Sequence, residues 1–558
     1  MYLPAALSPL RLTVYRRLWF AYVVTSLGTW LQNTGAGWLM TSIDPSPLIV
    51  AMVQAATILP AFLLALPGGA LADIVDRRRF LIGTQAWTML CAAALAALTL
   101  AHLTDAWALL GFTFAIGIGS ALTAPAWSAI IPELVPRGDL VQAIALNGIG
   151  FNLARALGPA LAGFLVLIAG TGITFALYAL SIGAVIWALV MWRKRRRDQR
   201  SALPREHLLS AMRAGLRFVR NTPALRAAMV RSFAYSVPAS APWALLPLVV
   251  REQLGLGAGM YGLILGLMGV GGVASGMLLP AISARLNRGW IVVAATLASC
   301  AGMAVLGVAH HWLVAAAGMA IFGTGWVASF SVIQAAAQLV APPWVRARSL
   351  AIYQLSYNGA LTLGSFGWGW LAGMVGLSAT LLIAAGLGAA GAFAVRGFGL
   401  DRRPVPAPLL SPEAEASPEA PAAEFVPHLV RGRVLEMMRY RVSPEHRGEF
   451  LELMGEIRRV RHRAGALTWQ LCEDVAHPEG WIELWSMENW TDHLREAERL
   501  SQDDRAGLAR AASFIDPTMP RACRYLAVEP ARSHGGGSEF KIHTPKHDPK
   551  HNAKRTLH

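Results

Sequence analysis

Long apolar blocks, separated by short polar or basic segments, make up most of the first 400 residues. Two of these blocks, residues 48–72 and 80–101, each exceed the roughly 20 residues that a helix needs to cross the core of a bilayer. The blocks are apolar on all sides rather than at amphipathic spacing. They therefore predict membrane-spanning helices and exclude a water-soluble helical bundle.

Counting the blocks predicts an all-α membrane protein with twelve transmembrane helices in two halves of six. The expected spans are 18–41, 48–71, 80–102, 105–127, 144–168 and 172–192, followed by 228–250, 259–282, 289–309, 312–338, 349–374 and 377–397. Aligning the stretch from Ala145 with the stretch from Ala351 superposes Asn152 on Asn358 and Gly163 on Gly369. This weak repeat is typical of transporters built from two parallel repeats.

Composition agrees with a membrane protein, with 55% hydrophobic and 15% charged residues. The net charge of +16 does not indicate nucleic-acid binding, because the basic residues gather at the edges of the apolar blocks. Alternate loops carry these residues: Arg11, Arg16, Arg17, Arg77 to Arg79, Arg137, the run 193–200, Arg285, Arg288, Arg346, Arg348, Arg402 and Arg403. The positive-inside rule then places both termini in the cytoplasm of a bacterial-type inner membrane.

The rest of the chain divides by composition. We expect halves at 1–192 and 228–400, a basic cytoplasmic loop at 193–227 with an amphipathic stretch, and a Pro/Ala/Glu linker at 401–430, followed by a soluble block at 431–530 and a flexible basic tail at 531–558. No cleavable signal peptide is visible. The four cysteines have no metal spacing, and the chain has no P-loop, so we expect no metal, no cofactor and no ATP-driven transport.

The segment GALADIVDRRR, residues 69–79, lies between the second and third expected helices. It resembles the cytoplasmic signature of the major facilitator superfamily. The resemblance implies a gate made by Gly69, Asp73 and Arg77, with Asp73 facing the start of the eleventh helix near Ser349 and Arg77 pairing with an acidic residue of its own half. Asp76 stands where the family usually has glycine, and the next two arginines are expected only to set topology.

A second motif, Gly158, Pro159 and Gly163, lies in the fifth expected helix. It resembles the glycine–proline signature of the superfamily's exporters, and the surrounding residues resemble the subgroup of enterobactin and macrolide exporters. Small residues allow close helix packing, and proline removes a backbone donor. The resemblance implies export by alternating access.

Arg155 lies about ten residues into the same helix, roughly 15 Å deep by helical rise. Because an intramembrane charge by default marks a pathway, we expect it to face a central cavity and attract an anionic group. The other cavity candidates are polar or aromatic: Gln32, Asn33, Trp127, Asn152, Trp243, Gln334, Tyr357 and Asn358. Every Asp and Glu before residue 400 lies in a loop or at a helix edge, so proton coupling stays open, with Asp73, His102, His310 and His311 as the available groups.

The block after the linker alternates strand and helix patterns in the order βαββααβ. That order suggests a ferredoxin-like sheet with helices on one face. The block resembles the antibiotic-biosynthesis-monooxygenase type of dimeric α/β barrel, which implies self-association. His493, Trp469, Trp481 and Trp485 could line a pocket there, but a single histidine without a nucleophile or metal set favours a non-catalytic module.

These patterns together predict a secondary active transporter that exports a small amphipathic or anionic molecule, siderophore-like or drug-like. Its partners are the cargo, the lipid bilayer and protons as the candidate coupling ion. Two alternatives stay open. One is an importer or lipid mover of the same fold, and the other is a membrane-tethered enzyme that acts through the C-terminal block.

Overall fold

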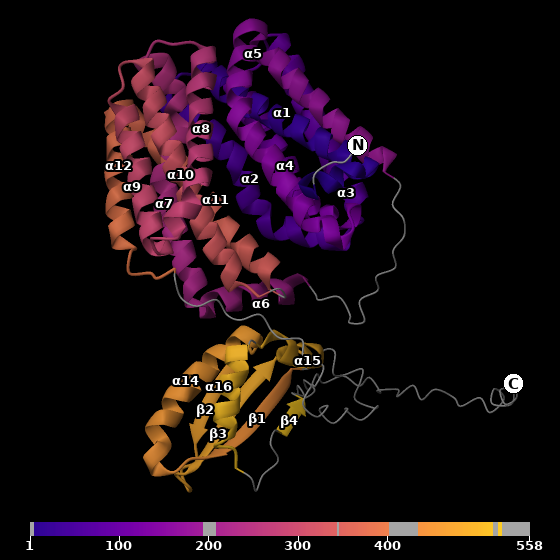
Figure 1. Cartoon of the computed structure of the whole chain (residues 1–558), viewed down its shortest axis with the longest axis vertical. Coiled ribbons are helices and arrows are strands. Elements are labelled where there is room, and N and C mark those ends of the chain that lie inside the picture. Colours follow the sequence, from indigo (N-terminus) through magenta and orange to yellow (C-terminus); the bar gives the residue numbers. More distant parts are fainter. Residues whose placement is uncertain are drawn as a thin grey trace, which may run out of the picture.

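The computed structural model describes residues 5–192, 208–342, 345–400, 433–500, 502–516 and 523–526. Two groups of long helices lie side by side, and a small sheet domain lies beyond one end of them (Figure 1). The first group contains α1 (Thr13–Ile43), α2 (Pro47–Ile74), α3 (Arg77–Leu100), α4 (Ala106–Leu134) and α5 (Leu140–Met191). The second contains α7 (Pro223–Leu248), α8 (Ala258–Ser283), α9 (Arg288–Gly307), α10 (Trp312–Val340), α11 (Arg346–Val375) and α12 (Leu377–Ala394).

Nine helices among the described residues are long and apolar enough to cross a membrane by length and composition. One of the nine is α5, whose 52 residues exceed the length of a single crossing. Gly170 interrupts α5 with a φ of 80° and a ψ of 169°, a conformation that an L side chain rarely adopts. The two expected spans 144–168 and 172–192 are therefore the two arms of α5, and glycine permits the turn between them.

The region expected as a loop at 193–227 contains a helix, α6 (Leu208–Asn221), and α7 begins at Pro223 rather than at residue 228. Phe218 and Val219 of α6 are buried in one cluster with Ile352 and Tyr353 of α11. Helix α6 lies between the bundle and the sheet domain, where it contacts α14 (Figure 1). The amphipathic stretch thus lies at the end of the bundle that carries the arginine-rich loops.

The sheet domain contains β1 (Val434–Arg441), α14 (Arg447–Ala464), β2 (Thr468–Glu473), β3 (Gly480–Met487), α15 (Trp490–Arg499), α16 (Gln502–Ala512) and β4 (Cys523–Leu526). Its four strands are antiparallel in the order β2-β3-β1-β4. Alternate residues of β1 and β3, among them Tyr440 and Trp481, pack against Phe450 and Ile457 of α14. The element order is the one that the hydrophobic pattern predicts.

Candidate functional site

The two helix groups come into backbone contact where α5 crosses α8. A methyl group added at Gly163 would lie 2.7 Å from the Cα of Gly262, and one added at Gly262 would lie 2.4 Å from the carbonyl oxygen of Pro159. Only glycine permits this backbone-to-backbone contact. Sequence analysis identified Gly163 but missed Gly262, although the spacing of Gly262, Gly266 and Gly269 on one face of α8 was a readable pattern.

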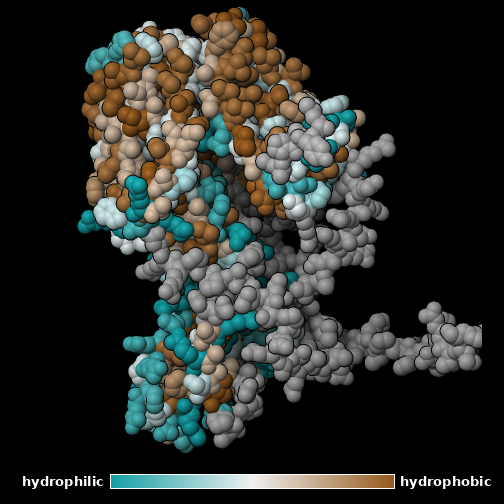
Figure 2. All heavy atoms as spheres, viewed as in Figure 1, coloured by the Kyte–Doolittle hydropathy of each residue, from teal (hydrophilic) through white to brown (hydrophobic). Residues whose placement is uncertain are grey.

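Further contacts between the groups lie at the ends of the helices away from the arginine-rich loops. Arg251, in the π-helical turn Val249–Gln253 that extends α7, donates hydrogen bonds to Thr41 (3.1 Å) and Ser42 (2.5 Å) at the end of α1. Its guanidinium also lies 5.7 Å from the ring centre of Trp38. These contacts close that end of the bundle, whereas the surface is hollowed between the groups on the side nearer the sheet domain (Figure 2).

A pocket between the groups is lined by Arg155 and Pro159 of α5, Trp30 of α1, Trp243 of α7, and residues of α8 and α10. Gly158 lets the two helices meet here, because a methyl group at that position would lie 2.6 Å from the Cβ of Trp30. The glycine–proline motif therefore places Arg155 beside an aromatic wall. Arg155 follows the start of α5 by fifteen residues, about 22 Å at 1.5 Å per residue.

Aromatic rings continue from this pocket into the second group. Trp30 stacks on Trp243 with ring centres 6.3 Å apart, and Trp243 meets Trp326 edge-on at 5.5 Å. Trp326 lies 6.4 Å from Tyr357, which lies 5.1 Å from Phe330. The predicted residues Trp243 and Tyr357 are thus brought together, and sequence analysis missed the other three rings. The five rings form a continuous aromatic row from the first helix group into the second.

The charge of Arg155 has no carboxylate within ion-pair distance among the described residues. Its guanidinium donates to Asn152 Oδ1 at 2.9 Å and lies 5.8 Å from the ring centre of Phe151. The indole N–H of Trp243, in the same pocket, has no hydrogen-bond partner in the described part of the chain. The guanidinium of Arg155 and the indole N–H of Trp243 can together bind an anionic or hydrogen-bond-accepting group.

The remaining cavity candidates are not gathered at this pocket. Trp127 stacks on Tyr22 at 5.0 Å within the first group. Gln32 is 1% exposed, and neither polar atom of its amide has a partner among the described residues. The amide of Asn152 donates a hydrogen bond to the carbonyl oxygen of Gly148 in its own helix and accepts one from Arg155. Asn33, Gln334 and Asn358 are half-buried, and the described structure shows no polar side-chain contact for any of the three.

In the arginine-rich segment, the backbones of Gly69 and Asp73 lie in the last turns of α2, and the side chain of Asp73 lies outside the described structure. Arg77 forms an ion pair of 3.1 Å with Glu133 of α4. Asp76 caps α3 by accepting a hydrogen bond from the backbone N–H of Arg79 (3.0 Å), which explains how the chain turns without the family's glycine.

One expectation for this segment needs correction. Arg78 does more than set topology, since it donates to the carbonyl oxygens of Leu189 (2.7 Å) and Val190 (2.9 Å). These are among the last carbonyls of α5, which lack partners within the helix. Arg78 therefore ties the start of α3 to the end of α5.

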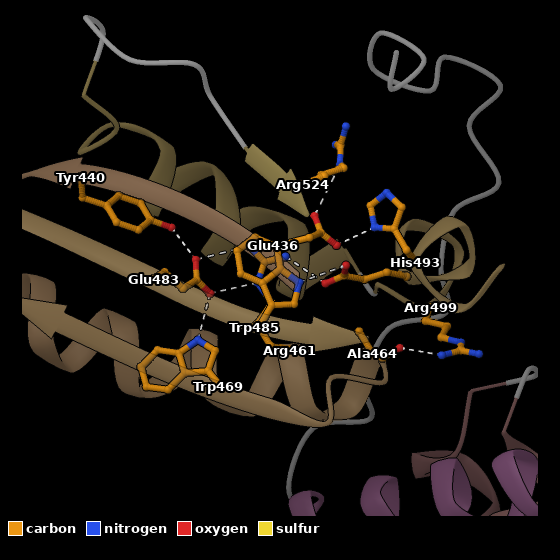
Figure 3. Close-up of polar contacts among 11 residues, drawn as sticks. Glu436, Tyr440, Arg461, Ala464, Trp469, Glu483, Trp485, His493, Arg499 and Arg524 are labelled. Atoms are coloured by element: carbon orange, nitrogen blue, oxygen red, sulfur yellow. Dashed lines mark hydrogen bonds and ion pairs between the residues drawn. The ribbon is translucent and has the colours of Figure 1, made fainter. Parts of the chain in front are cut away.

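A second polar cluster lies inside the sheet domain, where sequence analysis had singled out His493 and three tryptophans (Figure 3). Arg461 of α14 pairs with Glu483 (3.0 Å) and Glu496 (2.9 Å), and its guanidinium lies 3.6 Å from the ring centre of Trp485. The indole N–H of Trp469 and the hydroxyl of Tyr440 donate to Glu483 at 2.9 and 2.7 Å. This arginine is fully paired.

His493 belongs to the same cluster and lies 2.5 Å from Glu436 through Nδ1. Burial raises the pKa of Glu496 above its ordinary value; Arg461 opposes this rise and Glu436 adds to it. Trp481 lies apart, in the hydrophobic core with Phe450. Three of the four predicted residues therefore surround buried carboxylates rather than an open pocket.

Comparison with known proteins decides the family. The model of the Transmembrane secretion effector family matches residues 4–532, which include both helix groups and the sheet domain. The chain belongs to this family. It is an integral, multi-pass transporter of the major facilitator superfamily, consistent with a protein that is not an enzyme.

Curated relatives are similar at low identity. The staphyloferrin A transporter of Staphylococcus aureus (strain NCTC 8325 / PS 47) is 23% identical over 293 residues, which are 52% of this chain and 72% of that protein. The enterobactin exporter of Citrobacter koseri (strain ATCC BAA-895 / CDC 4225-83 / SGSC4696) is 25% identical over 272 residues, 47% of this chain and 62% of that one.

Solved structures agree on the fold of the helical part. A bacterial homologue of the human lysosomal transporter Spinster, inward-facing and unoccupied, covers 71% of this chain and 98% of its own at a TM-score of 0.54 and 13% identity. A bacterial homologue of the iron transporter ferroportin, also inward-facing, covers 69% of this chain and 98% of its own, with a TM-score of 0.54 and 15% identity. At these identities the likeness concerns the fold alone.

Proposed function

We propose that this transporter exports a small anionic, ring-bearing molecule by alternating access across twelve membrane-spanning helices, with both termini in the cytoplasm. The observation that carries the proposal is Arg155, a cation in the middle of the bundle that faces tryptophan rings and has no carboxylate beside it in the described structure. A cargo with an anionic group would supply the missing charge, and its ring would lie against Trp30 and Trp243.

Charge and shape together support the proposed direction of transport. The hollowed side of the bundle carries the arginine-rich loops, which favour the cytoplasm. A pocket open to the cytoplasm can load cargo for release outside once the halves rock. Enterobactin export by one relative supports this direction.

Gating is the proposed role of Gly69, Asp73 and Arg77. The ion pair of Arg77 with Glu133 is internal to the first group, so it can hold α3 against α4 while Asp73 meets or leaves the start of α11. Ser349 at that start is buried, and its hydroxyl has no partner among the described residues. The sheet domain, which we infer to be ferredoxin-like from its strand order β2-β3-β1-β4, is a candidate for self-association.

The test measures uptake of labelled enterobactin and staphyloferrin A into everted membrane vesicles, in which export appears as uptake. Wild-type vesicles should accumulate at least one of the two compounds, an uncoupler should abolish accumulation if protons drive it, and Asp73→Asn should reduce it. A truncation after residue 404 separates transport from any chemistry of the sheet domain. Uptake into right-side-out vesicles, with none into everted ones, would reverse the direction and overturn export.

A further inference from the structure

His493 and Glu496 lie one helical turn apart on α15, at the i, i+3 spacing that places two side chains on one face. Glu436 reaches the same point from β1, and one ligand atom from each of the three residues lies within 4.8 Å of the others. All three are buried, with exposures of 9% for His493, 5% for Glu496 and 3% for Glu436. A histidine and a glutamate at this spacing, joined by a carboxylate from another element, also hold metals in helical carboxylate proteins.

The surrounding residues hold the two carboxylates in place (Figure 3). Arg461 and the indole N–H of Trp485 engage Glu496 at 2.9 and 3.4 Å, and Arg524 lies 3.6 Å from one oxygen of Glu436. Both oxygens of each carboxylate have a partner, and because a carboxylate oxygen has two lone pairs, each keeps acceptor capacity beyond these contacts. Outer partners of this kind orient the carboxylate ligands of metal sites.

The charges of the cluster favour a cation. Three buried carboxylates, Glu436, Glu483 and Glu496, face two guanidinium groups, Arg461 and Arg524. The formal charges of these five side chains sum to minus one before His493 is counted. Buried charge is costly unless it is paired, and a bound cation would pair it.

We propose that Glu436, His493 and Glu496 bind one divalent transition-metal ion inside the sheet domain. One imidazole nitrogen and two carboxylates suit zinc, cobalt, iron and manganese, and three protein ligands leave coordination positions open for water or a further ligand. The sequence predicted no metal site, because Glu436 and His493 are 57 residues apart and only the fold brings them together. The proposal stands apart from the transport function.

The test uses the purified full chain in detergent, stripped with EDTA, dialysed against Zn²⁺ and analysed for bound zinc. The sequence has five histidines after residue 533, so binding is compared between variants that all keep this tail. Wild type should retain one more equivalent of zinc than His493→Gln or Glu436→Gln. His477→Gln is the matched control, since His477 is an exposed histidine with a single carboxylate, Asp474, at 3.5 Å; it should bind as wild type does. Equal zinc in wild type and both site variants would overturn the proposal.

A second measurement avoids variants that fail to fold. X-ray absorption of wild-type protein carrying one equivalent of zinc should show a shell of one imidazole and carboxylate oxygens. A shell of several imidazoles would assign the metal to other histidines and overturn the site. Cobalt in place of zinc gives an absorption spectrum that reports the same ligand set and should be lost in His493→Gln.

Discussion

Arg155 in the helical bundle and Arg461 in the sheet domain stand in opposite environments. Arg461 lies between two carboxylates and over a tryptophan ring, with 8% of its side chain exposed. Arg155 also lies beside tryptophans, but its hydrogen bond goes to the neutral amide of Asn152. One arginine is neutralised by its own fold, and the other is not neutralised by any described residue.

This difference separates a structural charge from a binding charge. A buried ion pair holds elements together when both partners are present, and it destabilises the fold strongly when one is removed. A cation without a carboxylate inside a membrane is retained only at a cost, which an incoming anion offsets. Substitutions at the two arginines should therefore affect different properties, one the stability of a domain and the other transport.

The largest effect is expected for Arg461→Met. It leaves Glu483 and Glu496 buried without a counter-charge, which costs about 3–5 kcal/mol. Hydrogen exchange of residues 434–526 in the full chain should accelerate strongly, while the bundle stays protected. Arg459→Met, on the exposed face of the same helix, is the control and should change little. Similar exchange rates in both variants would mean that the ion pairs of Arg461 do not stabilise the domain.

Arg155→Met should come next, with at least a tenfold loss of uptake of an anionic compound into everted vesicles, equivalent to about 1.4 kcal/mol. The fold should survive, because the side chain's hydrogen bond lies within its own helix. Arg155→Lys should keep part of the activity, since the charge remains. An esterified, uncharged analogue is the control: if its uptake falls equally, Arg155 does not recognise charge.

Arg251→Ala tests the contacts that close the far end of the bundle. It removes two hydrogen bonds between the helix groups and a cation–π contact with Trp38, each worth about 0.5–1.5 kcal/mol. We expect a several-fold shift of the population toward a bundle open at that end. Spin labels at Leu103 and Val308, both exposed, should report longer distances. Arg285→Ala at the opposite end should leave these distances unchanged. A longer distance in the Arg285→Ala variant as well would mean that the contacts of Arg251 are not what closes the far end.

The apolar blocks were sufficient to predict the long helices of the bundle, because a bilayer demands long uninterrupted apolar segments. The pattern could not show that Gly170 joins two spans into one element, or that α6 packs on α11. Arg155, Trp243 and Tyr357 were identifiable as charged or aromatic residues in apolar helices. Trp30, Trp326 and Phe330 were missed, since single aromatic residues in a membrane helix more often pack or face lipid.

The polar cluster of the sheet domain was harder to predict for a physical reason. Its members come from four strands and two helices, and no local spacing links Glu436 or Arg461 to His493. Only the antiparallel pairing of β1 with β3 places Glu436 opposite Trp485. The short-range part, the i, i+3 pair on α15, was readable but does not by itself distinguish a ligand pair from a solvated helix face.

The smallest effect is expected for Glu133→Gln, which removes the carboxylate from Arg77. The two side chains are 27% and 33% exposed, and ion pairs in contact with solvent contribute about 0–1 kcal/mol. Bundle stability should therefore change by less than about 1 kcal/mol. A double-mutant cycle with Arg77→Gln measures the coupling free energy, once in stability and once in uptake. A small coupling in stability with a larger one in uptake would mean that the pair differs between the two states of the transporter, as a gate requires. Equal coupling in stability and in uptake would mean that the pair only holds α3 against α4 and plays no part in gating. The gate would then depend on the other residues of the segment 69–79.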